Sequence, residues 1–168
     1  MPRLFVAVEL PSEVLDVVGA LPRPAVDGLR WTSREQWHVT LRFLGSVEDV
    51  DGVATALGSV RVPHRAAVLG PEIGRFGQRV LHIPVTGLDD VAVAVVEATA
   101  AVGRPPEDRP FAGHVTLARV RGRRRVDLRP LTGAGVEATW PVDAVTLFES
   151  RLHPKGARYE VVARFPLD

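Results

Sequence analysis

Hydrophobic residues fill every second position along several short segments of the chain. In residues 3–10, Leu or Val occupies each even-numbered position, and Phe5, Ala7 and Glu9 lie between them. A period of two is typical of a β-strand, because successive side chains of a strand point to opposite faces. Hydrophobic runs bounded by turn residues predict further strands, two of them joined by a turn at residues 74–78. The predicted strands cover residues 3–10, 37–44, 66–73, 79–85, 113–120, 144–148 and 159–165.

Three segments between these strands have helical spacing. The strongest covers residues 88–102, with two aspartates in its first turn and a glycine after its end. A short helix is predicted after Pro11, with Ser12 as its N-cap, and a third runs from the capping pattern Ser46 and Asp49 to about residue 60. Because strands and helices do not alternate regularly, the order predicts an α+β fold with largely antiparallel sheets.

One seven-residue pattern occurs twice. Residues 37–43 read Trp-His-Val-Thr-Leu-Arg-Phe, and residues 113–119 read Gly-His-Val-Thr-Leu-Ala-Arg. Each copy lies on a predicted strand, one in each half of the chain. This repeat predicts a duplicated lobe and an approximate two-fold relation between the halves.

The repeat places the same chemistry on each strand. Residues i and i+2 of a strand share a face, so His38 lies beside Thr40, and His114 beside Thr116. Cleavage of a phosphodiester at neutral pH needs one group that takes a proton from the nucleophile and one that protonates the leaving oxygen. Histidine suits both tasks, and threonine hydroxyls can donate to the non-bridging oxygens. If the lobes are related by a two-fold, the two faces meet around one phosphate.

Composition narrows the alternatives. The 168 residues suit one domain or two packed lobes, and the absence of cysteine excludes disulfides, zinc-thiolate sites and cysteine nucleophiles. No carboxylate or histidine stands at metal-ligand spacing from either motif, and no glycine-rich phosphate loop or serine-nucleophile elbow is present. The chain has no bilayer-length apolar run and no signal-peptide pattern, so we expect a cytoplasmic protein with no membrane partner. A lone histidine of this kind is more often a hydrogen-bonded sheet residue; the second copy is what favours catalysis.

The paired motifs resemble the 2H phosphoesterase superfamily, whose signature is two His-x-Thr/Ser-x elements. More closely, the chain is similar to the bacterial and archaeal RNA 2′,3′-cyclic phosphodiesterases, long called 2′-5′ RNA ligases. The likeness covers nearly the whole chain. It is carried by residues 3–11, 38–45, 109–119, 147–150 and 156–159.

This resemblance implies an α+β, bilobal 2H phosphoesterase (LigT-like) fold for residues 1–168, with two pseudo-symmetric lobes and mainly antiparallel sheets around a central cleft. It implies that His38 and His114 act on one phosphate held by Thr40 and Thr116. One histidine would activate water and the other would protonate the departing ribose oxygen, leaving a 2′-phosphomonoester. We assign His38 as the acid and His114 as the base, although the pseudo-symmetry allows the reverse.

Three further features of the sequence leave a question open about their role. Arg119 matches the family's arginine after the second motif and is carried over as a phosphate or substrate contact. Its odd offset from His114 would turn it to the opposite face of an ideal strand, so a local bend is needed. Phe76, on the turn at residues 74–78, is either a base-stacking residue or a packed turn aromatic. The basic run Arg121–Arg125 is either a solvated loop or a track for RNA backbone.

The leading hypothesis is hydrolysis of 2′,3′-cyclic phosphate ends of RNA or nucleotides by a monomer without metal or cofactor. A second uses the same residues for 2′-5′ ligation, with an RNA 5′-hydroxyl in place of water. A third is a non-catalytic module that binds RNA ends. Intact His and Thr in both motifs argue against the third, and water in excess argues against the second as the main reaction.

Overall fold

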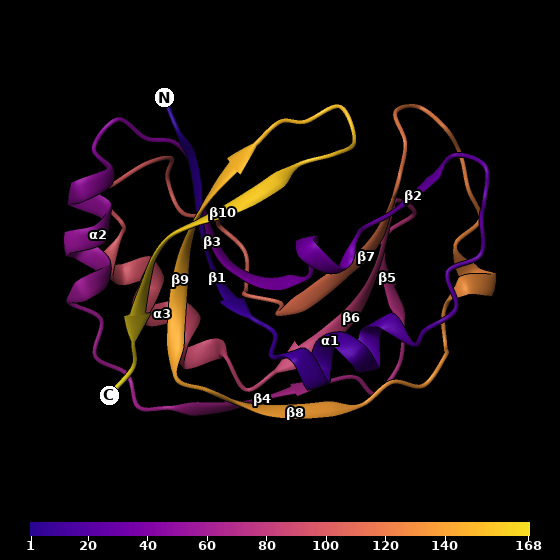
Figure 1. Ribbon diagram of the computed structural model, residues 1–168, viewed down its shortest axis with the longest axis horizontal. Coiled ribbons are helices and arrows are strands. Elements are labelled where there is room, and N and C mark those ends of the chain that lie inside the picture. Colours follow the sequence, from indigo (N-terminus) through magenta and orange to yellow (C-terminus); the bar gives the residue numbers. More distant parts are fainter.

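Ten strands form two sheets, and each sheet carries one copy of the repeated motif (Figure 1). The computed structural model describes residues 1–168. The strands are β1 (Arg3–Glu9), β2 (Leu29–Trp31), β3 (His38–Ser46), β4 (Arg65–Leu69), β5 (Gly74–Phe76), β6 (Val80–Thr86), β7 (His114–Val120), β8 (Ala138–Val142), β9 (Ala144–Arg151) and β10 (Arg158–Pro166). The first sheet has the order β10-β9-β1-β3, and the second has the order β2-β7-β6-β4-β8, with β5 paired to β6. Every pairing is antiparallel, so the predicted α+β, two-lobed fold is confirmed.

Three α-helices, α1 (Ser12–Gly19), α2 (Val50–Gly58) and α3 (Asp89–Ala98), cover these sheets. Helix α3 comes from the second half of the chain but contacts β3 of the first sheet. Helix α1 comes from the first half but contacts β8 of the second, and α2 contacts α3 and β10. This exchange joins the two lobes, and β3 and β7 contact each other where the sheets meet. None of the helices has the length and apolar character needed to span a bilayer.

Three predicted helix boundaries are wrong. Helix α1 is preceded by Pro11 in an extended conformation, so Ser12 is not its N-cap. Strand β3 continues through Ser46, and α2 is capped by Asp49, whose carboxylate accepts a hydrogen bond from the Gly52 amide at 2.8 Å. Helix α3 ends at Ala98 rather than near residue 102.

The early end of α3 has a local cause in Arg42. Its buried guanidinium donates to the carbonyls of Thr99, Val102 and Arg104 at 3.0–3.1 Å, and to the Thr99 hydroxyl at 2.8 Å. These bonds satisfy carbonyls at the helix terminus, where the negative end of the helix dipole also favours a cation. The chain that follows Ala98 is therefore held against Arg42 of the first sheet.

Three short strands were not predicted from the pattern. The segment taken as a turn contains β5, and β2 has only three residues, too few to show a period. Strand β8 contains Pro141, which argues against a central strand. Proline is tolerated there because β8 lies at the edge of its sheet, where one side needs no hydrogen bonds.

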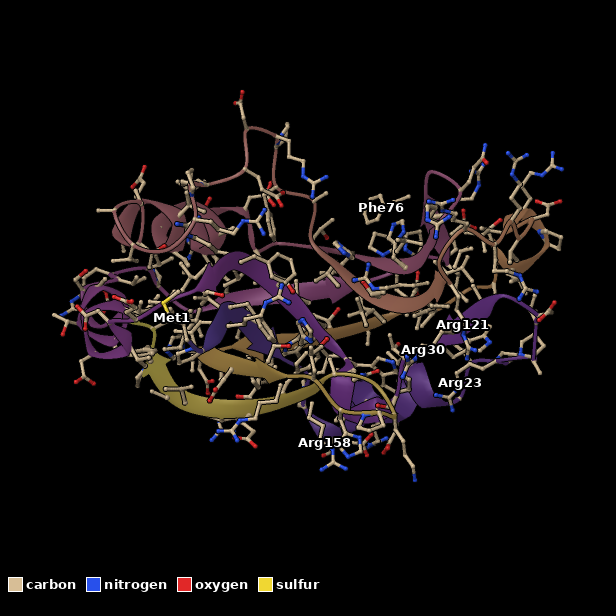
Figure 2. The ribbon with its side chains drawn as sticks, turned by 90° about the horizontal axis from the view of Figure 1, so that it is seen from above. Met1, Arg23, Arg30, Phe76, Arg121 and Arg158 are labelled. Atoms are coloured by element: carbon tan, nitrogen blue, oxygen red, sulfur yellow. The ribbon has the colours of Figure 1, made fainter.

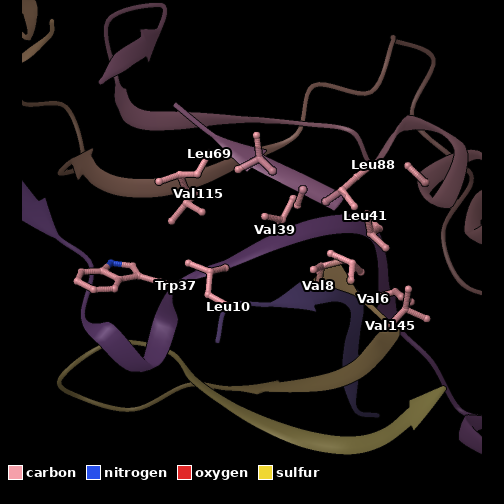
Figure 3. Packing of buried hydrophobic residues seen from close by; sticks show 14 of the residues in the cluster. Val6, Val8, Leu10, Trp37, Val39, Leu41, Leu69, Leu88, Val115 and Val145 are labelled. Carbon is pink, nitrogen blue, oxygen red and sulfur yellow. The ribbon is translucent and has the colours of Figure 1, made fainter. Parts of the chain in front are cut away.

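A single cluster of 37 buried hydrophobic residues runs through both lobes. The valine and leucine of each motif, Val39, Leu41, Val115 and Leu117, belong to it and are at most 5% exposed. Figure 3 labels the first three of them within the cluster. The even-numbered side chains of β1 also face this cluster, as predicted. The odd face of β1 lies in a second, smaller cluster of Phe5, Ala7 and Phe148, against which Tyr159 packs.

Candidate active site

Five side chains that the sequence singled out, His38, Thr40, His114, Thr116 and Arg119, define what we call the histidine site. His38 and Thr40 begin β3, and His114 and Thr116 begin β7. All four are partly buried, while the residues between them are in the core. The structure therefore anchors each motif by its apolar face and presents the His and Thr side chains on the other.

Each motif strand contains a β-bulge directly after the threonine. On β7 the partners of His82 and Leu81 are Thr116 and Ala118, so Leu117 is an extra residue. On β3 the extra residue is Leu41. A bulge lets two consecutive side chains point inward and restores the following residue to the original face.

The bulge removes the objection to Arg119. Leu117 and Ala118 are both buried, and Arg119 returns to the exposed face. Its positive charge helps to lower the pKa of both His38 and His114. The corresponding residue of the first motif is Phe43, which is 51% exposed. Counting alternate positions from His114 placed Arg119 on the opposite face of the strand, because an ideal strand has no extra residue.

His38 is held by a backbone bond and by aromatic rings. Its Nδ1 donates to the Gln36 carbonyl at 2.8 Å, because a carbonyl can only accept. This bond fixes the neutral tautomer and leaves Nε2 as an acceptor for the Thr40 hydroxyl at 2.8 Å. The imidazole also lies 4.9 Å from the Phe5 ring and 5.2 Å from the edge-on ring of Tyr159.

His114 repeats this arrangement in the second lobe. Its Nδ1 donates to the Ala112 carbonyl at 2.7 Å, again from two residues earlier in the chain. In both neutral histidines Nε2 is thus the unprotonated nitrogen, which can accept a proton and donates one in the charged form. In both motifs the histidine is the first residue of its strand, and its ring bonds to the carbonyl two residues earlier in the chain.

Electrostatics disfavour the charged form of both imidazoles. Burial is the main cause that lowers the pKa of His38 to about 4, and the charges of His114 and Arg119 act in the same direction. Burial also lowers the pKa of His114, with a smaller contribution from Arg119 and Arg109. The two histidines begin β3 and β7, the strands through which the two lobes contact each other.

Phe76 lies beside His114, in the part of the site that the second sheet contributes. Its ring stacks on the His82 imidazole at 3.8 Å with an interplanar angle of 3°, and it meets His114 edge-on at 4.7 Å. The Phe76 side chain is 39% exposed, so the turn aromatic is packed on one side and open on the other. His82 is 8% exposed, and its Nδ1 has no hydrogen-bond partner.

Thr32 joins the two motif strands. Its hydroxyl lies 2.8 Å from the Thr116 carbonyl and 2.9 Å from that of Leu117, and its amide donates to Leu117 at 2.8 Å. The Trp37 indole nitrogen donates to the same hydroxyl at 2.9 Å. Since Trp37 precedes His38, this bridge fixes the start of β3 against the bulge of β7.

Sequence reasoning missed three of these neighbours as site residues: Thr32, Tyr159 and His82. None lies in a motif, and each reaches the site from a different strand or loop. Tyr159 is the only tyrosine of the chain, and burial raises the pKa of its hydroxyl while Arg119 opposes that shift. Strand pairing could have indicated His82 alone, because it lies opposite Thr116. No group of three or more His, Asp or Glu residues is placed to hold a metal ion.

Comparison with known proteins finds one family over most of the chain. The family described as LigT-like phosphoesterase matches residues 5–80 and 86–159. A Thermus thermophilus protein named RNA 2′,3′-cyclic phosphodiesterase is 33% identical over 98% of this chain and 90% of its own length. A protein of the same name from Escherichia coli is 28% identical over 98% and 96%. One from Geobacillus stearothermophilus is 29% identical, but this chain spans only 56% of its length.

Solved structures show the same fold. A crystal structure of a protein from Thermus thermophilus has a TM-score of 0.78 and 28% identity, covering 98% of this chain and 97% of that one. The crystal structure of apo LigT from Escherichia coli has a TM-score of 0.74 and 25% identity, covering 99% and 98%.

Proposed function

This chain belongs to the LigT-like phosphoesterase family, and from that premise we propose that it hydrolyses 2′,3′-cyclic phosphates at the ends of RNA or of nucleotides. The relatives that match nearly the whole chain carry the name of that activity. The observation that carries the proposal is the matched pair of imidazoles. Each holds its Nδ1 proton on a backbone carbonyl and keeps Nε2 as the nitrogen that can exchange a proton with substrate.

The reaction needs one proton acceptor and one proton donor at the same phosphorus. In the proposed mechanism His114 takes a proton from water as the water oxygen attacks phosphorus. The bond from phosphorus to O3′ breaks, and O3′ takes the proton carried by Nε2 of His38. The product is a 2′-phosphomonoester, with His38 neutral and His114 protonated, and exchange of one proton with solvent restores the starting state.

Charge in the transition state falls on the non-bridging phosphate oxygens. We assign the hydroxyls of Thr40 and Thr116 and the guanidinium of Arg119 to these oxygens. The Thr40 hydroxyl, now bonded to His38, would turn to the phosphate when substrate arrives. Both proton transfers then come from side chains of one chain, so the proposal requires neither a metal ion nor a second subunit. Phe76 presents an open ring face beside His114, which suits stacking of the terminal base.

The assignment of His38 as the acid rests on burial. A proton on His38 is unfavourable in the free protein because the ring is desolvated. A bound phosphate anion next to a desolvated ring raises its pKa strongly, since Coulomb attraction grows as the local dielectric falls. His38 would thus be protonated only with substrate present. His114 is partly buried, but its bond to the Ala112 carbonyl lies at the surface of the protein, where water can reach the ring.

The direct test is product analysis with a short RNA ending in a 2′,3′-cyclic phosphate. We expect a 2′-phosphate, at an unchanged rate in the presence of a chelator. His38→Ala and His114→Ala should each lower kcat by at least about 100-fold. His64→Ala, at an exposed histidine outside the site, is the matched control and should keep wild-type activity. Loss of activity with the chelator, or full activity in either site variant, would overturn the proposal.

A second substrate tests the acid assignment. Sulfur in place of O3′ leaves without protonation, because a thiolate is far less basic than an alkoxide. His38→Ala should therefore recover much of its lost rate on the 3′-thio cyclic substrate, while His114→Ala should not. The reverse pattern would exchange the two roles and leave the rest of the proposal intact.

A further inference from the structure

Arg30 lies directly opposite Arg119 in the sheet. The β2–β7 ladder pairs Leu29 with Val120, Arg30 with Arg119, and Trp31 with Ala118. Directly paired residues of antiparallel strands share a face, with Cβ atoms about 4.5–5.5 Å apart. The Arg30 side chain therefore starts on the same face as the guanidinium of the histidine site.

Two like charges in this position repel each other, and neither has a compensating partner. Arg30 and Arg119 make no side-chain hydrogen bond and no ion pair, although both guanidinium groups have five donors. Other arginines of the chain do have such partners. Seven others form ion pairs: Arg34, Arg65, Arg109, Arg124, Arg129, Arg151 and Arg164. An uncompensated pair of cations beside the site indicates a polyanionic ligand.

The Arg30 guanidinium also reaches the first lobe. It lies against Gly156, in the loop between β9 and β10, where a Cβ would clash with it. Gln36 fixes this loop by donating to the Ala157 carbonyl at 2.8 Å. Arg30 thus stands where the two lobes meet, between the histidine site and the outer surface.

Beyond Arg30 the surface is hollowed. Arg30 and Arg121 line one open groove of about 520 Å³ together with Gly28 and Trp31. Figure 2 shows Arg30 and Arg121 at the same end of the molecule. Arg121 also has no ion partner, and Asp27, the one acidic residue lining the groove, is paired with Arg124, so two unpaired cations line the groove beyond Arg119.

We propose that Arg30 forms a second phosphate subsite, which binds the phosphodiester on the 5′ side of the terminal nucleotide while the cyclic phosphate lies in the histidine site. The strand then continues along the groove past Arg121. This inference rests on the proposed function and makes its substrate an RNA strand rather than a cyclic mononucleotide. Successive phosphates of a single strand are one nucleotide apart, a separation that two long, neighbouring side chains can span.

Three substrates distinguish the effect of the 5′-phosphate on hydrolysis from the effect of the neighbouring nucleoside. They are adenosine 2′,3′-cyclic phosphate, its 5′-phosphorylated form, and a dinucleotide ending in the same cyclic nucleotide. We expect kcat/KM to be about 10- to 100-fold higher for the two substrates with a 5′-phosphate, the effect of one charge-assisted contact. Arg30→Ala should remove most of this preference. Arg30→Lys should keep part of it, because lysine retains the charge but not the forked geometry.

Arg61→Ala is the matched control, since Arg61 is exposed and donates only to the nearby carbonyls of Gly58 and Val60 at the end of α2. It should leave the preference unchanged. The subsite would be overturned if the ratios of kcat/KM among the three substrates were the same in wild type and Arg30→Ala. An equal loss of kcat/KM on every substrate would also overturn it, because a merely structural role of Arg30 predicts that result. If the wild type hydrolyses none of them, the proposed function itself fails.

Discussion

The bridge through Thr32 gives a prediction that tests how the two histidines are held. Thr32→Val keeps the shape of the side chain but replaces the hydroxyl by a methyl group. The Trp37 indole nitrogen then loses its acceptor, and the carbonyls of Thr116 and Leu117 lose a donor. The Leu117 carbonyl keeps the amide of residue 32, so the main uncompensated group is the indole N–H.

The expected loss of stability follows from these groups. Trp37 is 5% exposed, and a buried donor without a partner costs about 1–3 kcal/mol. The lost hydroxyl bond to the β7 carbonyls adds about 1 kcal/mol. A total of about 2–4 kcal/mol corresponds to a fall in Tm of about 4–16 °C for a chain of this size.

The catalytic effect should exceed this loss of folded protein. Trp37 adjoins His38, and the Thr116 carbonyl belongs to the strand of His114, so the variant loosens both imidazoles. We expect kcat to fall about tenfold at a temperature where the variant is fully folded. KM should change little, because the side chains assigned to the phosphate remain.

Thermal unfolding and steady-state kinetics on the same preparations check both effects. Thr132→Val is the matched control, because the Thr132 hydroxyl donates to the Arg129 carbonyl at an exposed position. This substitution should change the free energy of unfolding by no more than about 0.5 kcal/mol, and Tm should shift correspondingly little. Thr32→Ser restores the hydroxyl and should recover kcat. A Thr32→Val protein with lowered Tm but wild-type kcat would show that the bridge only stabilises the fold, and an unchanged Tm would refute the bridge itself.

Two further predictions concern the charges and rings of the site. Burial and the Arg119 charge lower the pKa of His38 and His114, so the bell-shaped profile of kcat/KM should have its optimum below the ordinary histidine value of about 6.5; Arg119→Ala should move it to higher pH, and a shift to lower pH would contradict this reasoning. Phe76→Ala should raise KM for a cyclic nucleotide about 5- to 100-fold if the open ring face stacks on a base, and should leave hydrolysis of a cyclic phosphate without a base unchanged. An equal loss on both substrates would instead assign Phe76 to the support of His114.

The repeated motif predicted the part of the site that depends on period and duplication. His38, Thr40, His114 and Thr116 occupy strand positions whose faces follow from the alternation, and the core residues between them are buried as expected. Arg119 could not be placed in this way. A bulge inserts one residue without any signature in the local pattern, and it reverses the face of every residue that follows.

Long-range neighbours were beyond the same reasoning. Thr32 is 84 residues from Thr116, and Tyr159 reaches His38 from the last strand of the first sheet. Their contacts depend on strand order and on how the sheets meet, which local propensity does not encode. The early end of α3 could not be predicted for the same reason, because the carbonyls of Thr99 and Val102 just after the helix bind Arg42, which lies on β3.

The two copies differ most where the bulge ends. In the first copy the bulge is followed by Arg42, which turns inward to α3, and by the neutral ring of Phe43; in the second it is followed by Ala118 and by Arg119. A cation in both outward positions would attract phosphate more strongly, but it would also lower both histidine pKa values further and remove the proton that the acid needs. A single guanidinium therefore attracts the phosphate while leaving the histidine pKa values high enough for the acid to be protonated. This balance accounts for an arginine in only one of the two copies of the motif.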